Sequence, residues 1–199
     1  EKMNFPICVE NSSQYFPDVA SDGTSALVVW RSHRGNTLGF IRGAWIEWDD
    51  DGNWLLEEVV LGGPSCNTEG TCEEEQVCSA DLNLCTTTFG GQDQPSVASN
   101  GNGYLVTWHE TRNMMYRGTD LYGASVTKSD DAIQVNHGVS IAVDIDYTYN
   151  VSLTSVGADY FVTWRHTAMI DAVDQDVYGA LLQHTAEGWT VIASPVANM

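Results

Sequence analysis

Three histidines recur at similar places along the chain, each within three residues after a tryptophan. They are His33, His109 and His166, in the patterns W-x-x-H, W-H and W-x-H. Imidazoles at one rim could bind a metal or carry protons, but the unequal offsets favour polar loop residues that simply recur. Together with nearby charged residues, they predict a ligand-binding set of His109, Arg112, Asp120, His166 and Asp176.

Aspartates form a second group of chemically capable residues. Asp171, Asp174 and Asp176 give the pattern D-x-x-D-x-D, an oxygen-rich set of the kind that suits calcium. The alternative for Asp120 and Asp176 is structural, because an aspartate before Tyr-Gly-Ala can tie a loop to backbone N–H groups. The run "DDDGN" from Asp49 lacks the bidentate glutamate of a calcium loop and predicts a hairpin turn.

Catalytic motifs are missing from the sequence. G-x-S-x-G, H-E-x-x-H, a phosphate-binding glycine loop and C-x-x-C-H do not occur. Among the 27 acidic residues no pair is singled out as a glycosidase pair. The sequence therefore predicts a non-catalytic protein, with a glycoside hydrolase of the propeller type as a remote alternative.

Four of the five cysteines crowd into one polar segment, at Cys66, Cys72, Cys78 and Cys85. No pair has the C-x2-C spacing of a zinc ribbon and the segment has no histidine, which favours two disulfides of undetermined connectivity. Disulfides indicate an oxidising compartment, so we expect a secreted, cell-surface or periplasmic protein. Cys8 is the odd one, either a buried thiol or half of a bridge to another chain.

One sequence motif occurs three times and predicts the architecture. The runs "SALVVW", "GYLVTW" and "DYFVTW" are each followed by a Gly-Ala pair and then by a polar turn and another apolar run. Each unit predicts four short β-strands, recurring about every 50 residues once the cysteine-rich segment is set aside, which is typical of a β-propeller blade. The expected organisation is an N-terminal strand and blade 1 over 1–63, a disulfide insert over 64–88, blade 2 over 89–143 and blade 3 over 144–199.

The net charge of the chain limits the classes of partner that it is expected to bind. Twenty-seven acidic residues stand against eight lysines and arginines, a formal net charge of −19. Such a surface repels phosphate backbones and anionic lipid, so we expect no nucleic-acid binding. No apolar run reaches the roughly 18 residues that span a bilayer, so no membrane insertion is expected.

The repeated pattern P-x-V-A-S-x-G-x-x-Y-L-V-x-W, followed by D-[LV]-Y-G-A, resembles the repeats of secreted bacterial β-propeller proteins. The resemblance implies an all-β, propeller-like fold of three four-stranded blades. Because closed propellers have four to eight blades, we expect another polypeptide or further blades to complete it. The function expected is a binding or assembly module of a larger extracellular assembly. The alternative is a carbohydrate-binding propeller, in which Trp45, Trp48, Trp54 or Trp189 stacks on a glycan.

Overall fold

The structure is a computed structural model of the 199-residue chain. It describes residues 5–33, 39–49, 51, 54–61, 76–79, 84–87, 91–111, 118–129, 132–143, 147–168, 175–185 and 188–193.

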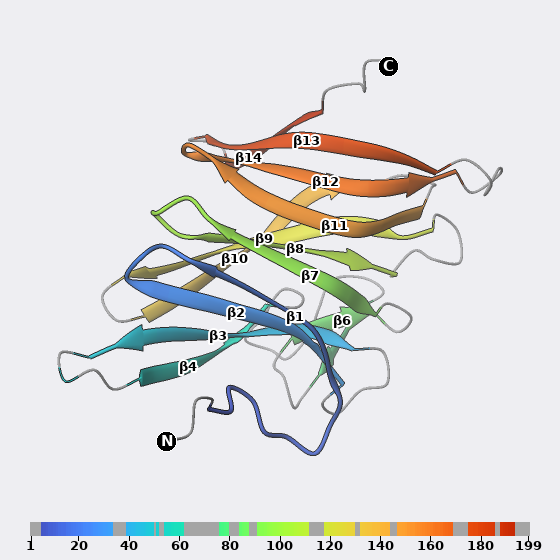
Figure 1. The fold of residues 1–199 in the computed structure, drawn as a ribbon. Coiled ribbons are helices and arrows are strands. Elements are labelled where there is room, and N and C mark those ends of the chain that lie inside the picture. The colour runs from blue at the N-terminus through green and yellow to red at the C-terminus, as the bar shows by residue number, and fades with distance from the viewer. Residues whose placement is uncertain are drawn as a thin grey trace.

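Twelve strands form three four-stranded antiparallel sheets (Figure 1). Sheet 1 contains β1 (Gln14–Ser21), β2 (Ser25–Ser32), β3 (Phe40–Trp48) and β4 (Trp54–Val60), in that spatial order. Sheet 2 contains β7 (Gln92–Ser99), β8 (Tyr104–Glu110), β9 (Asp120–Ser129) and β10 (Ala132–Ala142). Sheet 3 contains β11 (Tyr147–Val156), β12 (Asp159–Thr167), β13 (Gln175–Thr185) and β14 (Gly188–Ala193). Each sheet is a simple meander, so consecutive strands are always neighbours.

The first strands of the three sheets lie side by side. β7 contacts both β1 and β11, and the sheets follow one another in chain order from sheet 1 to sheet 3 (Figure 1). This arrangement is that of propeller blades stacked around a common axis. The all-β fold of three four-stranded blades predicted from the sequence is therefore confirmed.

Each of these first strands carries a bulge at the same repeat position. The register shifts between Tyr15 and Asp18 in β1, and correspondingly in β7 and β11. The first residue inside each shift has positive φ, namely Phe16 at 53°, Gln94 at 47° and Asn150 at 53°. Few non-glycine residues adopt this conformation, so its recurrence marks a bend built into every blade.

Side chains from neighbouring sheets form two hydrophobic clusters. One joins sheets 1 and 2 and includes Leu27, Trp45, Tyr104 and Trp108. The other joins sheets 2 and 3 and includes Leu105, Leu121, Tyr160 and Trp164 among its members. The repeated tryptophans Trp30, Trp108 and Trp164 are all buried, which confirms the prediction that they belong to the core. A single sheet has two apolar faces and can bury them only against its neighbours.

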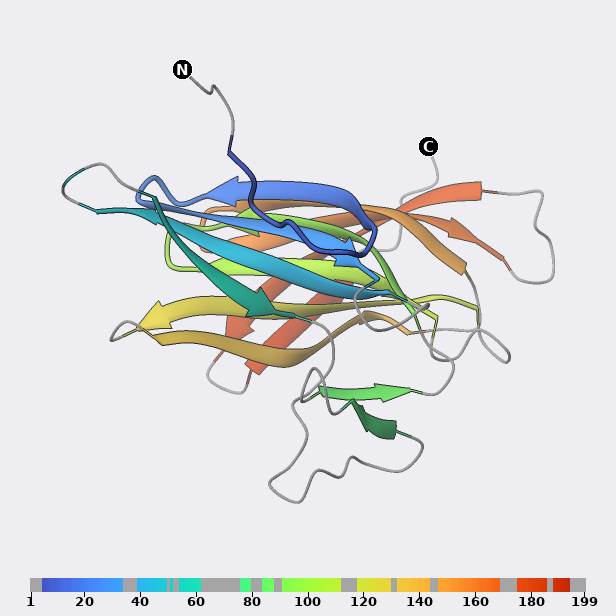
Figure 2. The same ribbon diagram turned by 90° about the horizontal axis from the view of Figure 1, so that it is seen from below.

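The cysteine-rich segment contributes a two-stranded hairpin, β5 (Gln76–Ser79) with β6 (Leu84–Thr87), which lies apart from the three stacked sheets (Figure 2). In its register Cys78 is directly opposite Cys85. Cys66 and Cys72 lie outside the described residues. Cys8 is half-buried in the segment before β1.

No helix in the described ranges is long and apolar enough to cross a membrane.

Candidate functional site

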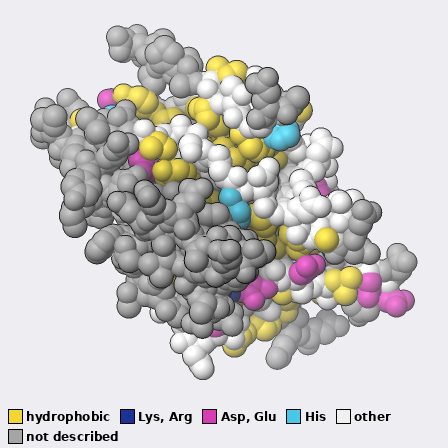
Figure 3. All heavy atoms as spheres, turned by 180° about the vertical axis from the view of Figure 1, so that it is seen from behind, with side chains coloured by type: hydrophobic (Ala, Val, Ile, Leu, Met, Phe, Trp, Pro, Cys, Tyr) yellow, Lys and Arg dark blue, Asp and Glu magenta, His cyan; other side chains and the backbone are white. Residues whose placement is uncertain are grey.

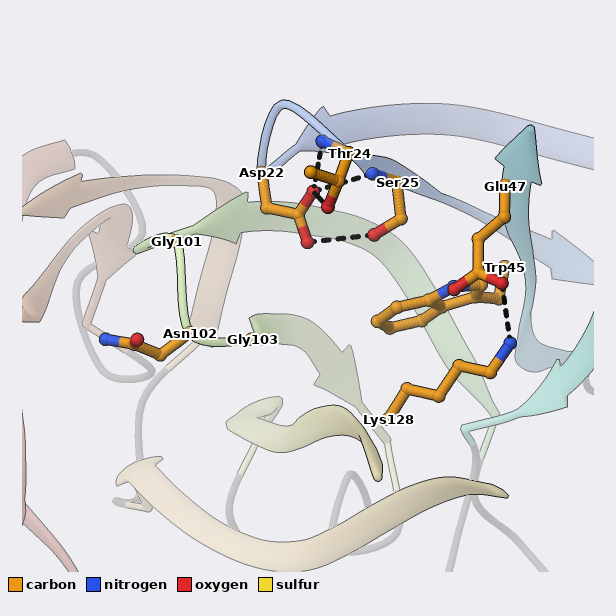
Figure 4. A pocket seen from close by; sticks show the side chains of 9 residues that line it. All are labelled: Asp22, Thr24, Ser25, Trp45, Glu47, Gly101, Asn102, Gly103 and Lys128. Atoms are coloured by element: carbon orange, nitrogen blue, oxygen red, sulfur yellow. Dashed lines mark hydrogen bonds and ion pairs between the residues drawn. The ribbon is translucent and has the colours of Figure 1, made fainter. Parts of the chain in front are cut away.

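A polar pocket of about 340 Å³ opens between sheets 1 and 2 (Figure 4). Three structural elements supply most of its wall: the β1–β2 turn, strand β3 and the β7–β8 turn, with one side chain from β9. The lining residues are Asp22, Thr24, Ser25, Trp45, Glu47, Gly101, Asn102, Gly103 and Lys128.

The Asp22 side chain is fixed by its own turn. Its Oδ1 accepts hydrogen bonds from the backbone N–H of Thr24 at 2.8 Å and of Ser25 at 2.7 Å, and its Oδ2 accepts one from Ser25 Oγ at 2.8 Å. Burial raises the pKa of Asp22, but the combined hydrogen bonds from Ser25 and Thr24 hold it below the usual value. Asp22 is therefore ionised at neutral pH and presents a preorganised acceptor.

Tyr104 locks this turn onto the neighbouring sheet. Its hydroxyl oxygen accepts a hydrogen bond from the Asp22 backbone N–H at 3.3 Å and shares another with Ser25 Oγ at 2.9 Å. The ring is buried and meets Trp45 edge to face, with 5.1 Å between ring centroids. The pocket floor is thus held by contacts that cross from sheet 2 to sheet 1, and it exists only when the two sheets are packed.

Glu47 and Lys128 form the charged side of the pocket. Lys128 Nζ lies 2.7 Å from Glu47 Oε2, and Trp45 Nε1 donates to Glu47 Oε1 at 2.7 Å. The hydrogen bond from Lys128 is the main cause that lowers the pKa of Glu47, against the smaller opposing effect of burial. Figure 4 shows Lys128 and Glu47 meeting beside the Trp45 indole.

The pocket therefore offers two carboxylates, one ammonium group, an amide from Asn102, hydroxyls and an indole edge. Such groups, fixed around a concave space, give directional hydrogen bonding to a polar ligand. In the described part of the chain, no group of three or more His, Cys, Asp or Glu side chains is placed to hold a metal ion. The calcium prediction concerned Asp171 and Asp174, which lie outside the described residues, and Asp176, which is exposed on β13.

His109, predicted to bind a ligand, lies buried between sheets 2 and 3. Its Nε2 accepts from the Val151 backbone N–H at 3.3 Å, so Nδ1 carries the proton and donates to Thr148 Oγ1, also at 3.3 Å. Burial, with a smaller contribution from Arg165, lowers its pKa to about 4. His109 is thus a neutral core residue that joins two sheets through its hydrogen bonds.

Asp120, His166 and Asp176, which were also predicted to bind a ligand, are not among the residues that line the pocket. Asp120 is fully buried on β9, with Tyr122 Oη 3.5 Å from its Oδ2. His166 stands opposite Asp176 in the β12–β13 register and contacts the Tyr178 ring at 4.4 Å between centroids. Arg112 lies outside the described residues. The structure brings His166 and Asp176 together as cross-strand neighbours, whereas His109 and Asp120 are buried elsewhere in the sheets.

Of the four tryptophans proposed for sugar stacking, Trp45 lines the pocket. Trp48 and Trp54 are exposed cross-strand partners in the β3–β4 hairpin, with ring centroids 4.5 Å apart. Trp189 packs against Tyr160 and His184 in sheet 3.

Sequence reasoning missed Asp22, Glu47, Asn102 and Lys128. The signal in the sequence that could have found them is a difference between the repeats. Asp22 of the first repeat is replaced by Asn100 in the second and Val156 in the third. Glu47 is replaced by Thr127 and Gln183. Lys128 is also one of only eight basic residues in the chain.

No family model matches this chain, and no curated protein does. Solved structures do match in fold. One is a sialidase of Trypanosoma rangeli in complex with sialic acid, with a TM-score of 0.45 and 13% identity over 90% of this chain. The chain spans 30% of that sialidase chain.

Two further matches cover more of the compared protein. An exo-1,5-α-L-arabinanase from a bovine ruminal metagenomic library has a TM-score of 0.39 and 9% identity over 92% of this chain and 78% of that chain. A thermostable family-43 glycoside hydrolase has a TM-score of 0.39 and 10% identity over 94% of this chain and 96% of that chain.

These comparisons correct one prediction. The sequence predicted a non-catalytic protein, and this is contradicted by the finding that five similar structures are enzymes: a sialidase, two arabinanases, a family-43 glycoside hydrolase and a xylosidase. The prediction rested on the absence of local catalytic motifs, and such an absence does not exclude an enzyme. At these identities the likeness describes the fold, and the reactions of those enzymes are not assigned to this chain.

Proposed function

We propose that this protein binds carbohydrate, and that the pocket between sheets 1 and 2 holds a neutral or amine-bearing sugar unit. The observation that carries the proposal is the lining of the pocket by fixed hydrogen-bonding groups: Asp22, Glu47, Lys128 and Asn102 around one cavity.

The size and the chemistry of the pocket support this class of ligand. A volume of about 340 Å³ falls at the small end of ligand pockets, which span roughly 300–1,000 Å³. Sugar hydroxyls donate to carboxylates and accept from ammonium and amide groups, so each polar group of the wall has a complementary partner on a sugar. Since Asp22 and Glu47 are already held by neighbouring side chains and backbone, little side-chain entropy is lost on binding.

The charge of the pocket selects within this class. Two ionised carboxylates face one lysine, which leaves an excess of negative charge. The chain as a whole is acidic, with 27 Asp and Glu against eight Lys and Arg, and on the face seen in Figure 3 Asp and Glu side chains are conspicuous and Lys and Arg are scarce. Acidic sugars are therefore disfavoured by repulsion, whereas a neutral or amino sugar is not.

A glycan array, followed by titration calorimetry on the strongest neutral glycan, tests the proposal. Asn102→Ala removes the pocket amide from an exposed turn where its side chain makes no hydrogen bond among the described residues. We expect about a tenfold loss of affinity, the value of one hydrogen bond to a ligand.

The matched control is Asn136→Ala, which removes another exposed asparagine, on β10 and outside the pocket lining. It should bind as the wild type does. Equal losses in the two variants, or preferential binding of sialylated glycans, would contradict the proposal.

A further inference from the structure

Equivalent residues on the three sheets differ sharply in exposure at one end of the stack. We define the following face of a sheet as the face turned toward the next sheet in chain order. On it, Leu27 of sheet 1 and Leu105 of sheet 2 are 0% exposed, whereas Phe161, at the same repeat position in sheet 3, is 41% exposed. The apolar character of the position is kept although nothing among the described residues covers it in sheet 3.

A second position repeats the observation. Ile41 and Leu121 are 0% exposed, and their counterpart Val177 is 70% exposed. Two further exposed apolar residues, Val156 and Ile192, lie on the same face. Ile192 pairs with Leu181, which pairs with Phe161, and Val156 is two residues along β11 from Thr154, which also pairs with Phe161. Sheet 3 is the last sheet of the stack in Figure 1. Its following face thus has the composition of a buried inter-blade face and the exposure of a surface.

The opposite end of the stack is covered only in part. The preceding face of sheet 1 carries Trp30, Ala44 and Ile46, which are buried, and also Trp48, Trp54 and Leu56, which are exposed. The segment before β1 packs beside this sheet: Phe5 contacts the Trp54 ring at 4.7 Å between centroids, and the Ser13 carbonyl accepts from the His33 N–H at 3.1 Å. A second copy stacking head to tail would therefore bring this segment, together with sheet 1, against Phe161 and Val177.

The two internal junctions show what kind of surface covers a following face. In each, the second strand of the incoming sheet begins with a tyrosine that reaches the first turn of the sheet before it. Tyr104 bonds to Asp22 and Ser25, and the Tyr160 hydroxyl donates to the Gly103 carbonyl at 3.1 Å. Sheet 1, which packs onto no earlier sheet among the described residues, carries Ala26 at this position. The tyrosine therefore accompanies a sheet that packs onto a preceding one.

We infer that the following face of sheet 3 is a docking surface for a further four-stranded blade of the same repeat, contributed by a partner polypeptide. The incoming blade presents an apolar preceding face to Phe161, Val177 and Ile192. A tyrosine at the position of Tyr104 and Tyr160 reaches the β11–β12 turn. The interface continues the pattern of the two junctions within the chain. Sheet 1 carries Ala26 in place of the junction tyrosine, which argues against a second copy as the occupant.

The test extends the full chain after Met199 with a copy of residues 89–143, which carry the preceding face of sheet 2. Hydroxyl-radical footprinting then reads the side-chain exposure of Phe161, whose peptide remains unique, with the exposed Tyr15 as internal reference. We expect oxidation of Phe161 to fall several-fold in the extended chain. The same extension with Tyr104→Ala in the added copy alone should recover much of the wild-type oxidation rate.

Unchanged oxidation of Phe161 would overturn the inference, and so would an added copy that stays unfolded by circular dichroism. Sedimentation velocity of the unextended chain tests whether a second copy occupies the face instead. A dimer, together with protection of Phe161 that grows with concentration, would assign the face to a second copy and contradict the proposed partner. A monomer with Phe161 oxidised at all concentrations agrees with the inference.

Discussion

The two junctions between sheets are built from the same parts, but the residues that line the polar pocket at the first are replaced at the second. Both bury a tryptophan and place a tyrosine on the preceding turn. At the first junction, Trp45, Glu47 and Lys128 surround a cavity. At the second, Ser125, Thr127 and His184 take the equivalent positions, and the buried His109 links the two sheets instead.

This difference separates the residues that make the fold from those that make a site. Positions that repeat, such as the tryptophans and the Gly-Ala pairs, carry the packing that every blade needs. Positions at which the three repeats differ do not carry this shared packing. The charged groups of the pocket all occupy such positions, as does His109.

The largest expected effect is on the free energy of unfolding, and it tests whether the buried tryptophans contribute equally to the two junctions. Trp108→Ala and Trp164→Ala should each lower the free energy of unfolding by about 3–5 kcal/mol, because each empties a buried aromatic site. Urea denaturation measures it. The control is Trp54→Ala on the exposed hairpin, which should cost far less. If the two buried substitutions differed widely, the junctions would not be equivalent.

The second effect should belong to the junction of sheets 2 and 3 alone. The pKa of His109 is about 4 in the folded state and 6.5 ordinarily, so the unfolded chain takes up a proton first as the pH falls. The contribution of His109 to the free energy of unfolding is therefore fully present above pH 6.5. It is lost progressively as the pH falls, by about 3 kcal/mol at pH 4.

His109→Gln removes one titrating group and should reduce the slope of the stability curve between pH 6.5 and 4, whatever its stability at neutral pH; part of the slope should remain, because burial also lowers the pKa of His137. Asn136→Ala, at an exposed position of β10, is the control and should keep the wild-type slope. Denaturant midpoints across this range decide the point. A wild-type slope in the His109 variant would show that other groups cause the acid sensitivity.

A smaller effect compares the two tyrosine contacts. Tyr104→Phe removes a hydroxyl that bonds to Asp22 and Ser25, whereas Tyr160→Phe removes a bond to one carbonyl. We expect losses of about 1–2 kcal/mol for Tyr104→Phe and about 1 kcal/mol for Tyr160→Phe. Only Tyr104→Phe should also weaken glycan binding, because it frees the turn that holds Asp22. If Tyr104→Phe and Tyr160→Phe changed glycan affinity equally, the turn that holds Asp22 would not be needed for binding.

The smallest effect on the sheets should come from the hairpin outside both junctions. Cross-strand partners in an antiparallel pair have Cα atoms about 4.5–5.5 Å apart, within disulfide range. Since Cys78 is the register partner of Cys85, we predict a Cys78–Cys85 bridge, which leaves Cys66 to pair with Cys72. Non-reducing peptide mapping checks the connectivity.

Cys78→Ser with Cys85→Ser should leave the unfolding midpoint of the three sheets nearly unchanged, because the hairpin lies apart from them. A Cys66–Cys78 or Cys72–Cys85 linkage, or four free thiols, would show the pairing to be wrong.

Much of the fold could be read from the sequence, whereas the pocket could not. Turn residues and apolar runs are local signals, and they recur three times, so the twelve strands and the burial of Trp108 and Trp164 followed from pattern alone. The described members of the predicted ligand set lie in different places, because position along a strand does not tell which face of a blade a side chain meets. His109, grouped by its place after a tryptophan, lies in the core.

The sequence by itself determined the repeat, the four-stranded meander and the acidic charge, since these depend on composition and on neighbours along the chain. Only the tertiary structure decided which side chains share a cavity. Lys128 and Glu47 are 81 residues apart and meet because sheet 2 packs on sheet 1. Tertiary packing also decided that Phe161 and Val177 remain exposed while their counterparts are buried. Exposure depends on what stands opposite a face, and no local pattern records the neighbour.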